Sequence, residues 1–223
     1  MEYILPALAA VSAYLISGIN PAIILSKAVY GKDIRECGSG NPGFTNFKRT
    51  FGSSLAFLVM ALDLLKSAIP SLIFGILFEE FFLEWQLGVA FTCAFSMIGH
   101  AFPLWYGFKG GKGFLVCLSA TWIFHPIAGL VATAVMIILL LSVKFMSLAT
   151  MAGLVCALGV IPLIGIENAA AFIIMCLCVA FMIFRHKENI IRLARGTESK
   201  FYIFGKPKVK SEESEHTMEE SKL

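Results

Sequence analysis

Long apolar runs separated by short polar loops make up most of this chain. Most runs approach the roughly 20 residues that cross a bilayer, and lipid offers no partners to backbone N–H and C=O groups, so each run is expected to be helical. The runs extend over Tyr3–Lys27, Gly52–Phe78, Trp85–Tyr106, Gly113–Phe124, Ile127–Val143, Met146–Gly165 and Ala169–Phe184. The pattern therefore predicts an all-α, polytopic membrane helical bundle with about seven transmembrane helices.

Two of these runs, the fourth and the fifth, are short and meet at His125-Pro126. The fourth is expected to be tilted or partly buried. The first run follows directly on Met1-Glu2, without the basic start of a cleaved leader. We therefore interpret it as a retained span.

Charge is distributed unevenly between the loops. Lys and Arg fall in the loops after the first, third, fifth and seventh runs. The intervening loops contain no Lys or Arg, and their titratable residues are Glu79, Glu80, Glu84, His125 and Glu167. Cytoplasmic loops are enriched in Lys and Arg, so the N-terminus is predicted outside and the C-terminus in the cytoplasm. Residues 1–205 are predicted to form one membrane domain, and the charged tail, 206–223, is predicted to be disordered.

Composition agrees with a membrane location. Hydrophobic residues account for 58% of the chain and charged residues for 15%, which excludes an ordinary soluble domain. Six cysteines occur without a CxxC pair, and five of them lie in apolar runs. They are expected to be small buried thiols, so we expect neither a disulfide framework nor a zinc site.

The first basic loop is rich in glycine and small polar residues. It contains the sequence Gly38-Ser-Gly-Asn-Pro-Gly43, which fits GxGxxG, but it follows a predicted membrane helix rather than a strand, so a dinucleotide site is rejected. Glycines allow successive N–H groups to point at one anion. Side-chain donors would complete the site. The candidate ligand-binding residues are Ser39, Gly40, Asn41, Thr45, Asn46 and Arg49.

The second basic loop places glycines where a helix is expected to begin. Gly110, Gly111 and Gly113 flank Lys112 there, and a helix N-terminus with an added cation favours phosphate. The Ser or Thr that follows the lysine of a Walker A loop is missing, so phosphate binding without ATP hydrolysis is predicted. His100 lies on the same predicted side, and it is either structural or directly involved.

The third polar segment follows the last run. Ile190, Ile191 and Leu193 predict an interfacial amphipathic helix, with Gly196 as its C-cap. That structure would not require His186, Asn189 and Glu198, which are candidate site residues.

One charged pair lies inside the second run. Asp63 and Lys66 would each cost roughly 2.5–3.5 kcal/mol at the bilayer centre, and their spacing puts them on one helix face. The pair is either a structural ion pair or a substrate contact.

These three segments resemble the signatures of the bacterial acyl-phosphate:glycerol-3-phosphate acyltransferase family. Gly38–Asn46 is similar to GSGNxGxTN, Gly99–Gly113 to GHxFPxxxxFKGGKG, and Arg185–Lys200 to RHxxNIxRLxxGTExK. The chain differs from the family pattern at several positions near these loops, which leaves open a paralogue with altered substrates. They are Phe44, Phe47-Lys48, Ser67, Phe114 and Val116.

The resemblance implies transfer of an acyl group from acyl phosphate to the 1-hydroxyl of glycerol 3-phosphate, at the cytoplasmic face of a bacterial inner membrane. It implies that Ser39, Arg49 and Lys112 bind glycerol 3-phosphate and that His186 and Asn189 bind the donor phosphate. These two sets of assignments could be exchanged. The residues assigned to catalysis are His100, Lys112, His186, Asn189 and Glu198. Membrane lipids are the expected partners, and no nucleic acid, metal or cofactor is expected.

The base is left open between the two histidines and the donor's own phosphate. The HxxxxD signature of another acyltransferase class is absent, because Trp105 and Ile191 occupy the aspartate positions. An organophosphate transporter is the main alternative, although no internal repeat is evident. A structural or lipid-binding membrane protein would not need three polar segments.

Overall fold

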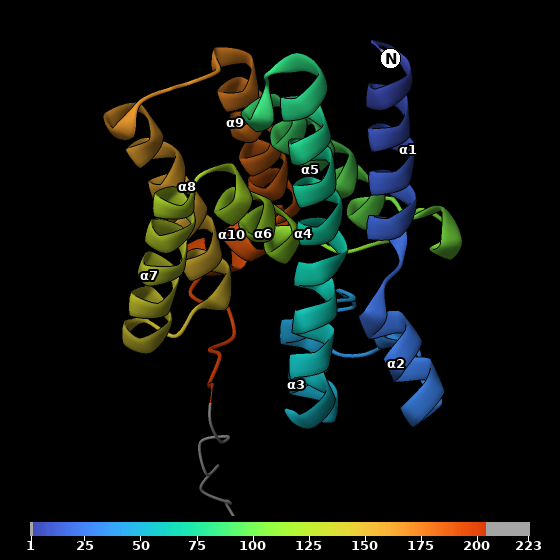
Figure 1. Ribbon diagram of the computed structural model, residues 1–223. Coiled ribbons are helices and arrows are strands. Elements are labelled where there is room, and N and C mark those ends of the chain that lie inside the picture. The colour runs from blue at the N-terminus through green and yellow to red at the C-terminus, as the bar shows by residue number, and fades with distance from the viewer. Residues whose placement is uncertain (1, 204–223) are drawn as a thin grey trace, which may run out of the picture.

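The computed structural model describes residues 2–203, and the regular secondary structure of those residues is entirely helical (Figure 1). The predicted tail, 206–223, lies outside the described residues. The α-helices are α1 (Ile4–Gly18), α2 (Pro21–Tyr30), α3 (Phe44–Phe51), α4 (Ser54–Phe82), α5 (Trp85–Ala101), α6 (Phe114–Phe124), α7 (Pro126–Ser142), α8 (Met146–Ile164), α9 (Ala169–Arg185) and α10 (Lys187–Ala194). Two short 3₁₀ turns lie at Ile34–Glu36 and Leu104–Tyr106.

Several helices are long and apolar enough to cross a membrane. Within the described residues four meet both criteria, Ile4–Tyr30 being taken as one, and a fifth does so if α9 and α10, bent by 58°, form one span. The helices α6 and α7 are apolar but shorter. The prediction of an all-helical membrane bundle is thus confirmed, whereas the count of seven spans and the outside N-terminus stay predictions.

The first predicted span is broken, which the apolar pattern did not indicate. Pro21 occupies the first turn of α2, and the Asn20 side chain caps this helix by accepting a hydrogen bond from the Ile23 N–H at 3.0 Å. The amide nitrogen of Asn20 donates to the carbonyl of Pro42 at 3.0 Å. The break therefore fixes α2 against the first glycine-rich loop.

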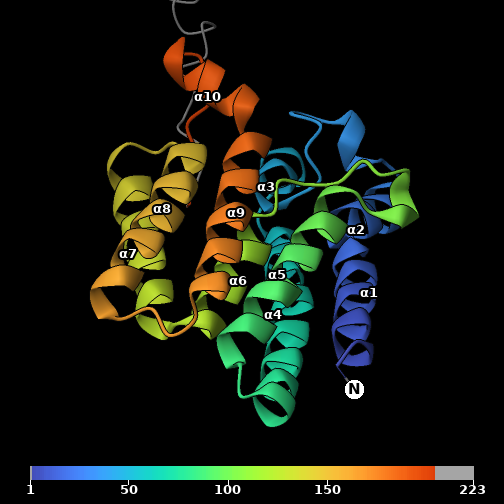
Figure 2. The same ribbon diagram turned by 90° about the horizontal axis from the view of Figure 1, so that it is seen from above.

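The helices pack closely where small residues line their contacts. A Cβ added to Gly99 would lie 2.2 Å from the carbonyl oxygen of Tyr14, so α5 approaches α1 with almost no gap. Gly153 similarly faces the carbonyl of Ala132, where α8 packs on α7. Figures 1 and 2 show α1 and α2 on one side of the α4–α5 pair and α7 and α8 on the other.

The short helix α6 lies between α4 and α7 and packs against both. Its first residues begin inside the bundle, because the preceding chain folds over the end of α5. This arrangement leaves room between the N-terminal end of α6, α4 and α7. The three polar segments of the sequence gather around that space.

Candidate active site

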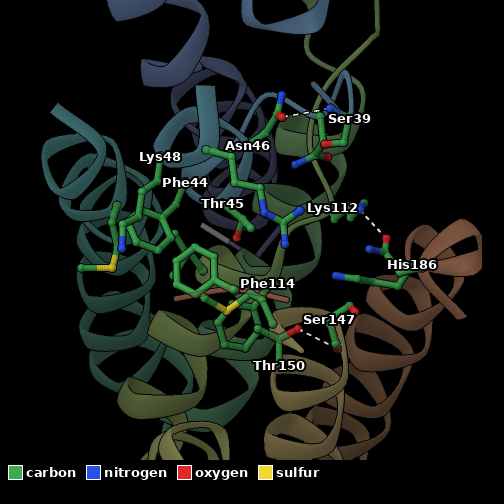
Figure 3. Close-up of a pocket in the computed structure, with 18 of the residues that line it drawn as sticks. Ser39, Phe44, Thr45, Asn46, Lys48, Lys112, Phe114, Ser147, Thr150 and His186 are labelled. Atoms are coloured by element: carbon green, nitrogen blue, oxygen red, sulfur yellow. Dashed lines mark hydrogen bonds between the residues drawn. The ribbon is translucent and has the colours of Figure 1, made fainter. Parts of the chain in front are cut away.

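A cavity of about 270 Å³ lies at the N-terminal end of α6 (Figure 3). It joins a polar end to an apolar end. Eleven of the fourteen predicted site residues line it, namely Ser39, Asn41, Thr45, Asn46, Arg49, His100, Lys112, Gly113, His186, Asn189 and Glu198. The lining does not include Gly40, Gly110 or Gly111. The cavity therefore brings together residues from all three polar segments.

The polar end centres on the carboxylate of Glu198. Its Oε1 accepts hydrogen bonds from Asn189 Nδ2 and Ser147 Oγ, both at 2.7 Å, and its Oε2 accepts one from Arg192 Nε at 2.7 Å. Burial alone would raise the pKa of Glu198, but these three donors outweigh burial and lower it. The carboxylate is therefore ionised near neutral pH. Glu198 lines the cavity itself and also orients the side-chain amide of Asn189.

Lys112 reaches the same network from the second glycine-rich loop. Its ammonium donates to Oδ1 of Asn189 (Figure 3). Burial, reinforced by repulsion from Arg192, lowers the pKa of Lys112 to about 8, with Glu198 opposing the shift. The ammonium remains mostly protonated at neutral pH. It is a half-buried cation that an incoming phosphate would find only partly neutralised.

His186 lies where α9 meets α10, and it is neutral. Its Nδ1 lies 2.8 Å from the carbonyl oxygen of Met182, so Nδ1 carries the proton and donates it. Burial lowers the pKa of His186 to about 4, although the bond to Met182 opposes the shift. The remaining nitrogen, Nε2, is left as an acceptor. His186 is therefore a weak base that accepts or shares a hydrogen bond in the cavity.

The first glycine-rich loop is folded around the side chain of Asn46. Oδ1 of Asn46 accepts from the Ser39 N–H at 3.0 Å, and Nδ2 donates to the Cys37 carbonyl at 2.9 Å. Gly38 has a φ of 56°, and a Cβ there would lie 2.4 Å from Oδ1 of Asn46. Asn46 thus shapes the loop, while the hydroxyl of Ser39 has no hydrogen-bond partner among the described residues.

Two basic residues of α3 hold the chain that follows Glu198. Nη2 of Arg49 donates to the carbonyls of Ser199 and Lys200 at 2.9 and 3.4 Å. Lys48 donates to the carbonyl of Tyr202 at 2.8 Å and to that of Ile203. Arg49 lines the cavity, but at least one of its nitrogens is committed to this segment. Its predicted role in binding phosphate therefore rests on the other nitrogens.

The second glycine-rich loop differs from the sequence prediction. The N–H groups of Gly110 and Gly111 donate to the carbonyls of Ala101 and His100, each at 3.1 Å, so they are not available to a phosphate. A Cβ on Gly111 would lie 2.2 Å from Nε2 of His100. These glycines allow the loop to pack on His100. The expectation that they cradle an anion is wrong for these two N–H groups.

The apolar end of the cavity extends between α4 and α7. Phe57 on α4 and Ile137 on α7 are 42% and 43% exposed, so this end is open to the surface that lipid would cover. Other apolar side chains line it, namely Phe44, Met60, Phe114, Leu115, Met136, Leu140, Met146, Phe201 and Ile203. A polar pocket therefore continues into an apolar groove.

Sequence reasoning missed several lining residues. Ser147 and Thr150 lie on α8, where single hydroxyls in an apolar run gave no signal. Arg192 occurs within the third motif, and its place six residues before Glu198 could have indicated their ion pair. Asp63, for which the sequence left a structural ion pair and a substrate contact open, also lines the cavity.

The fold and the site define an integral membrane helical bundle with a half-buried cation next to an apolar groove. The family model for glycerol-3-phosphate acyltransferases matches residues 7–196. The chain belongs to the glycerol-3-phosphate acyltransferase family, as the three motifs predicted, and it is an acyltransferase.

Individual relatives agree with this assignment. A Listeria monocytogenes protein named glycerol-3-phosphate acyltransferase is 35% identical over 192 residues, which cover 84% of this chain and 92% of the relative. A relative of the same name from Thermoanaerobacter pseudethanolicus is 37% identical, with 86% and 94% covered. The crystal structure of PlsY (YgiH), an integral membrane glycerol 3-phosphate acyltransferase, in its glycerol 3-phosphate form superimposes with a TM-score of 0.81 at 31% identity. The match covers 88% of this chain and 96% of that one.

Proposed function

We propose that this chain transfers a fatty acyl group from acyl phosphate to the 1-hydroxyl of glycerol 3-phosphate, giving lysophosphatidic acid and inorganic phosphate. The observation that carries the proposal is the continuity of the cavity. A polar end with Ser39, Lys112 and Asn189 opens into an apolar groove between α4 and α7. A donor with a phosphate and a fatty chain matches both ends, and a PlsY structure has been described in a lysophosphatidic acid form.

Phosphate binding would depend on the cations. Lys112, Arg192 and Arg49 all line the cavity, and Glu198 neutralises only part of this charge. Two phosphates, one on each substrate, would be held by these groups together with the hydroxyl of Ser39 and Nε2 of His186. We propose that glycerol 3-phosphate binds toward Ser39, Arg49 and Lys112. The donor phosphate would bind toward His186 and Asn189.

The chemical step needs no metal or nucleotide, because the acyl phosphate is already activated. The 1-hydroxyl oxygen attacks the acyl carbonyl carbon, the new ester bond forms, and the bond from that carbon to the phosphate oxygen breaks. Catalysis would consist mainly of positioning the two substrates and of stabilising the oxyanion that develops on the acyl group. A pKa of about 4 makes His186 a weak proton acceptor. We therefore propose that the departing phosphate, which gains basicity as its bond to carbon breaks, takes the hydroxyl proton.

The location follows from the same substrates. Glycerol 3-phosphate is water-soluble, and the basic loops are predicted to face the cytoplasm. We propose that the protein lies in the bacterial inner membrane with the polar end open to the cytoplasm and the apolar groove open to lipid. The reaction would then be an early step of phospholipid synthesis.

The test compares donors. Purified protein in lipid is given labelled glycerol 3-phosphate with acyl phosphate, acyl-CoA or acyl carrier protein carrying the same chain. Lysophosphatidic acid is expected with acyl phosphate alone. Product with another donor only would replace the donor assignment. Movement of labelled glycerol 3-phosphate into sealed vesicles, with no chemical change, would support a transporter instead.

A further inference from the structure

Asp63 and Lys66 form an ion pair inside α4 that the chemistry above does not use. Their carboxylate and ammonium lie 2.8 Å apart, and both side chains are buried. Ionisable residues within membrane helices are costly and are usually retained for function. Each partner of the pair reaches the support of a different glycine-rich loop.

Lys66 connects the pair to the first loop. Its Nζ donates to the carbonyl of Ile19 at 3.0 Å, at the break between α1 and α2. The last residues of a helix leave carbonyls without partners, and a cation is a favourable one. The next residue, Asn20, donates from Nδ2 to the carbonyl of Pro42 at 3.0 Å. Pro42 belongs to the loop that carries Ser39. Lys66 therefore fixes the segment on which that loop rests.

Asp63 connects the pair to the second loop. Its Oδ1 lies 4.0 Å from Nδ1 of His100, and this Nδ1 is buried without a hydrogen-bond partner among the described residues. The carbonyl of His100 accepts from the Gly111 N–H at 3.1 Å. The imidazole ring packs against Gly111, because a Cβ added there would lie 2.2 Å from Nε2 of His100. Lys112 is the next residue. Arg185 holds the same loop from the other side, through the carbonyls of Gly110 and Gly111.

We infer that the Asp63–Lys66 pair is a positioning element that sets the separation between the loop of Ser39 and the loop of Lys112. It would act through Ile19 and Asn20 on one side and through His100 on the other. This inference rests on the proposed function, since Ser39 and Lys112 are the groups assigned to glycerol 3-phosphate. Misplacing one loop would weaken binding of that acceptor, while the donor groove between α4 and α7 would keep its shape.

The decisive variant removes both charges. Asp63→Asn with Lys66→Met leaves no unpaired charge in the bundle, so it is expected to fold where a single replacement could fail. We expect the KM for glycerol 3-phosphate to rise by about tenfold or more, and the KM for acyl phosphate to change by less than about twofold. Wild-type values for both constants would show the pair to be structural only. A parallel rise in both constants would also overturn the inference.

Two further variants complete the test. Lys66→Arg keeps the charge but alters the reach to Ile19, so it is expected to raise only the KM for glycerol 3-phosphate, even if the double variant does not fold. An unchanged KM in this variant would contradict the inference. The matched control is Thr133→Val, which removes the 3.0 Å hydrogen bond between Trp122 on α6 and Thr133 on α7, away from both loops. It should leave both KM values unchanged, and a selective rise in the KM for glycerol 3-phosphate would count against the loop explanation.

Binding separates this inference from the proposed function. Labelled glycerol 3-phosphate is titrated against wild type and against each folded variant, without donor. Weaker binding by the Asp63 and Lys66 variants, with unchanged binding by Thr133→Val, supports the positioning role even if wild type makes no lysophosphatidic acid, an outcome that would overturn the proposed function alone. Equal binding by all of them would overturn the positioning role alone.

Discussion

Nδ2 of Asn189 donates to Oε1 of Glu198 at 2.7 Å, and this bond turns the amide oxygen of Asn189 toward the ammonium of Lys112. An amide has one donating and one accepting end, so the charge on Glu198 determines which end faces the cavity. Glu198, near the end of the described chain, thereby determines which atom of Asn189 faces the ammonium of Lys112.

Replacing Glu198 with glutamine should break this orientation. The new side-chain amide offers a donor as well as an acceptor, so Asn189 can turn and present its NH₂ group to Lys112. We expect kcat/KM of Glu198→Gln to fall by about ten- to a hundredfold with little loss of folded protein, because the variant is nearly isosteric. Steady-state kinetics alongside a thermal unfolding curve measure this. Full activity would show that the ordered amide is not needed.

The pKa of Lys112 gives a prediction about pH. Because burial lowers it to about 8, the free enzyme loses this cation as pH rises through that value. We expect kcat/KM for glycerol 3-phosphate to decline above about pH 8, where a solvated lysine would still be charged. The kcat/KM of Lys112→Arg should stay constant to higher pH, since a guanidinium stays protonated. Identical profiles for the two proteins would show that the decline has another source.

Lys112→Ala should chiefly raise the KM for glycerol 3-phosphate. The variant loses a charge-assisted contact that the bound phosphate would use in both ground and transition states, so we expect a rise of about tenfold or more. Lost turnover with an unchanged KM would move Lys112 to a chemical role.

His186 is expected to act without changing its charge. With its pKa lowered to about 4, the imidazole stays neutral at every pH where the protein is assayed. We expect His186→Asn to reduce kcat by about ten- to a hundredfold, and the loss to be the same between about pH 5.5 and 7.5. A loss that grows through an apparent pKa near 6.5 would indicate that His186 titrates and serves as a general base.

Gly111→Ala tests the contact between the second loop and α5. The added methyl would lie 2.2 Å from Nε2 of His100, so the loop and Lys112 must move. We expect the variant to lose about 90% or more of its activity toward glycerol 3-phosphate. Gly159→Ala on α8 is the control, because its Cβ meets no atom within 4 Å. Comparable losses in the two variants would show that the effect is not local.

The helical membrane fold could be predicted from sequence because lipid leaves few choices to a long apolar run. The amphipathic helix after the last run was also predictable, and it is present as Lys187–Ala194. The break at Ile19 could not be found in this way, since Asn20 and Pro21 interrupt an apolar run only briefly. The bond from Asn20 to the carbonyl of Pro42, which ties this break to the first glycine-rich loop, is likewise contained in no local pattern.

The composition of the site was easier to predict than its geometry. Glycines next to Lys112 indicated an anion site, but which N–H groups remain free depends on how the chain folds back on Ala101 and His100. Ser147 contacts Glu198 across 51 residues, and a single serine in an apolar helix carries no signal of such a contact. Long-range contacts of this kind appear only once the helices are packed.

Product stoichiometry tests the proposed reaction most directly. Purified protein in lipid is incubated with acyl phosphate and labelled glycerol 3-phosphate, and lysophosphatidic acid and inorganic phosphate are both quantified, with Lys112→Ala assayed in parallel. Transfer within the single cavity predicts equal amounts of the two products from wild type, and much less of both from the variant at low glycerol 3-phosphate. Phosphate release without lysophosphatidic acid, or no product above background, would contradict it.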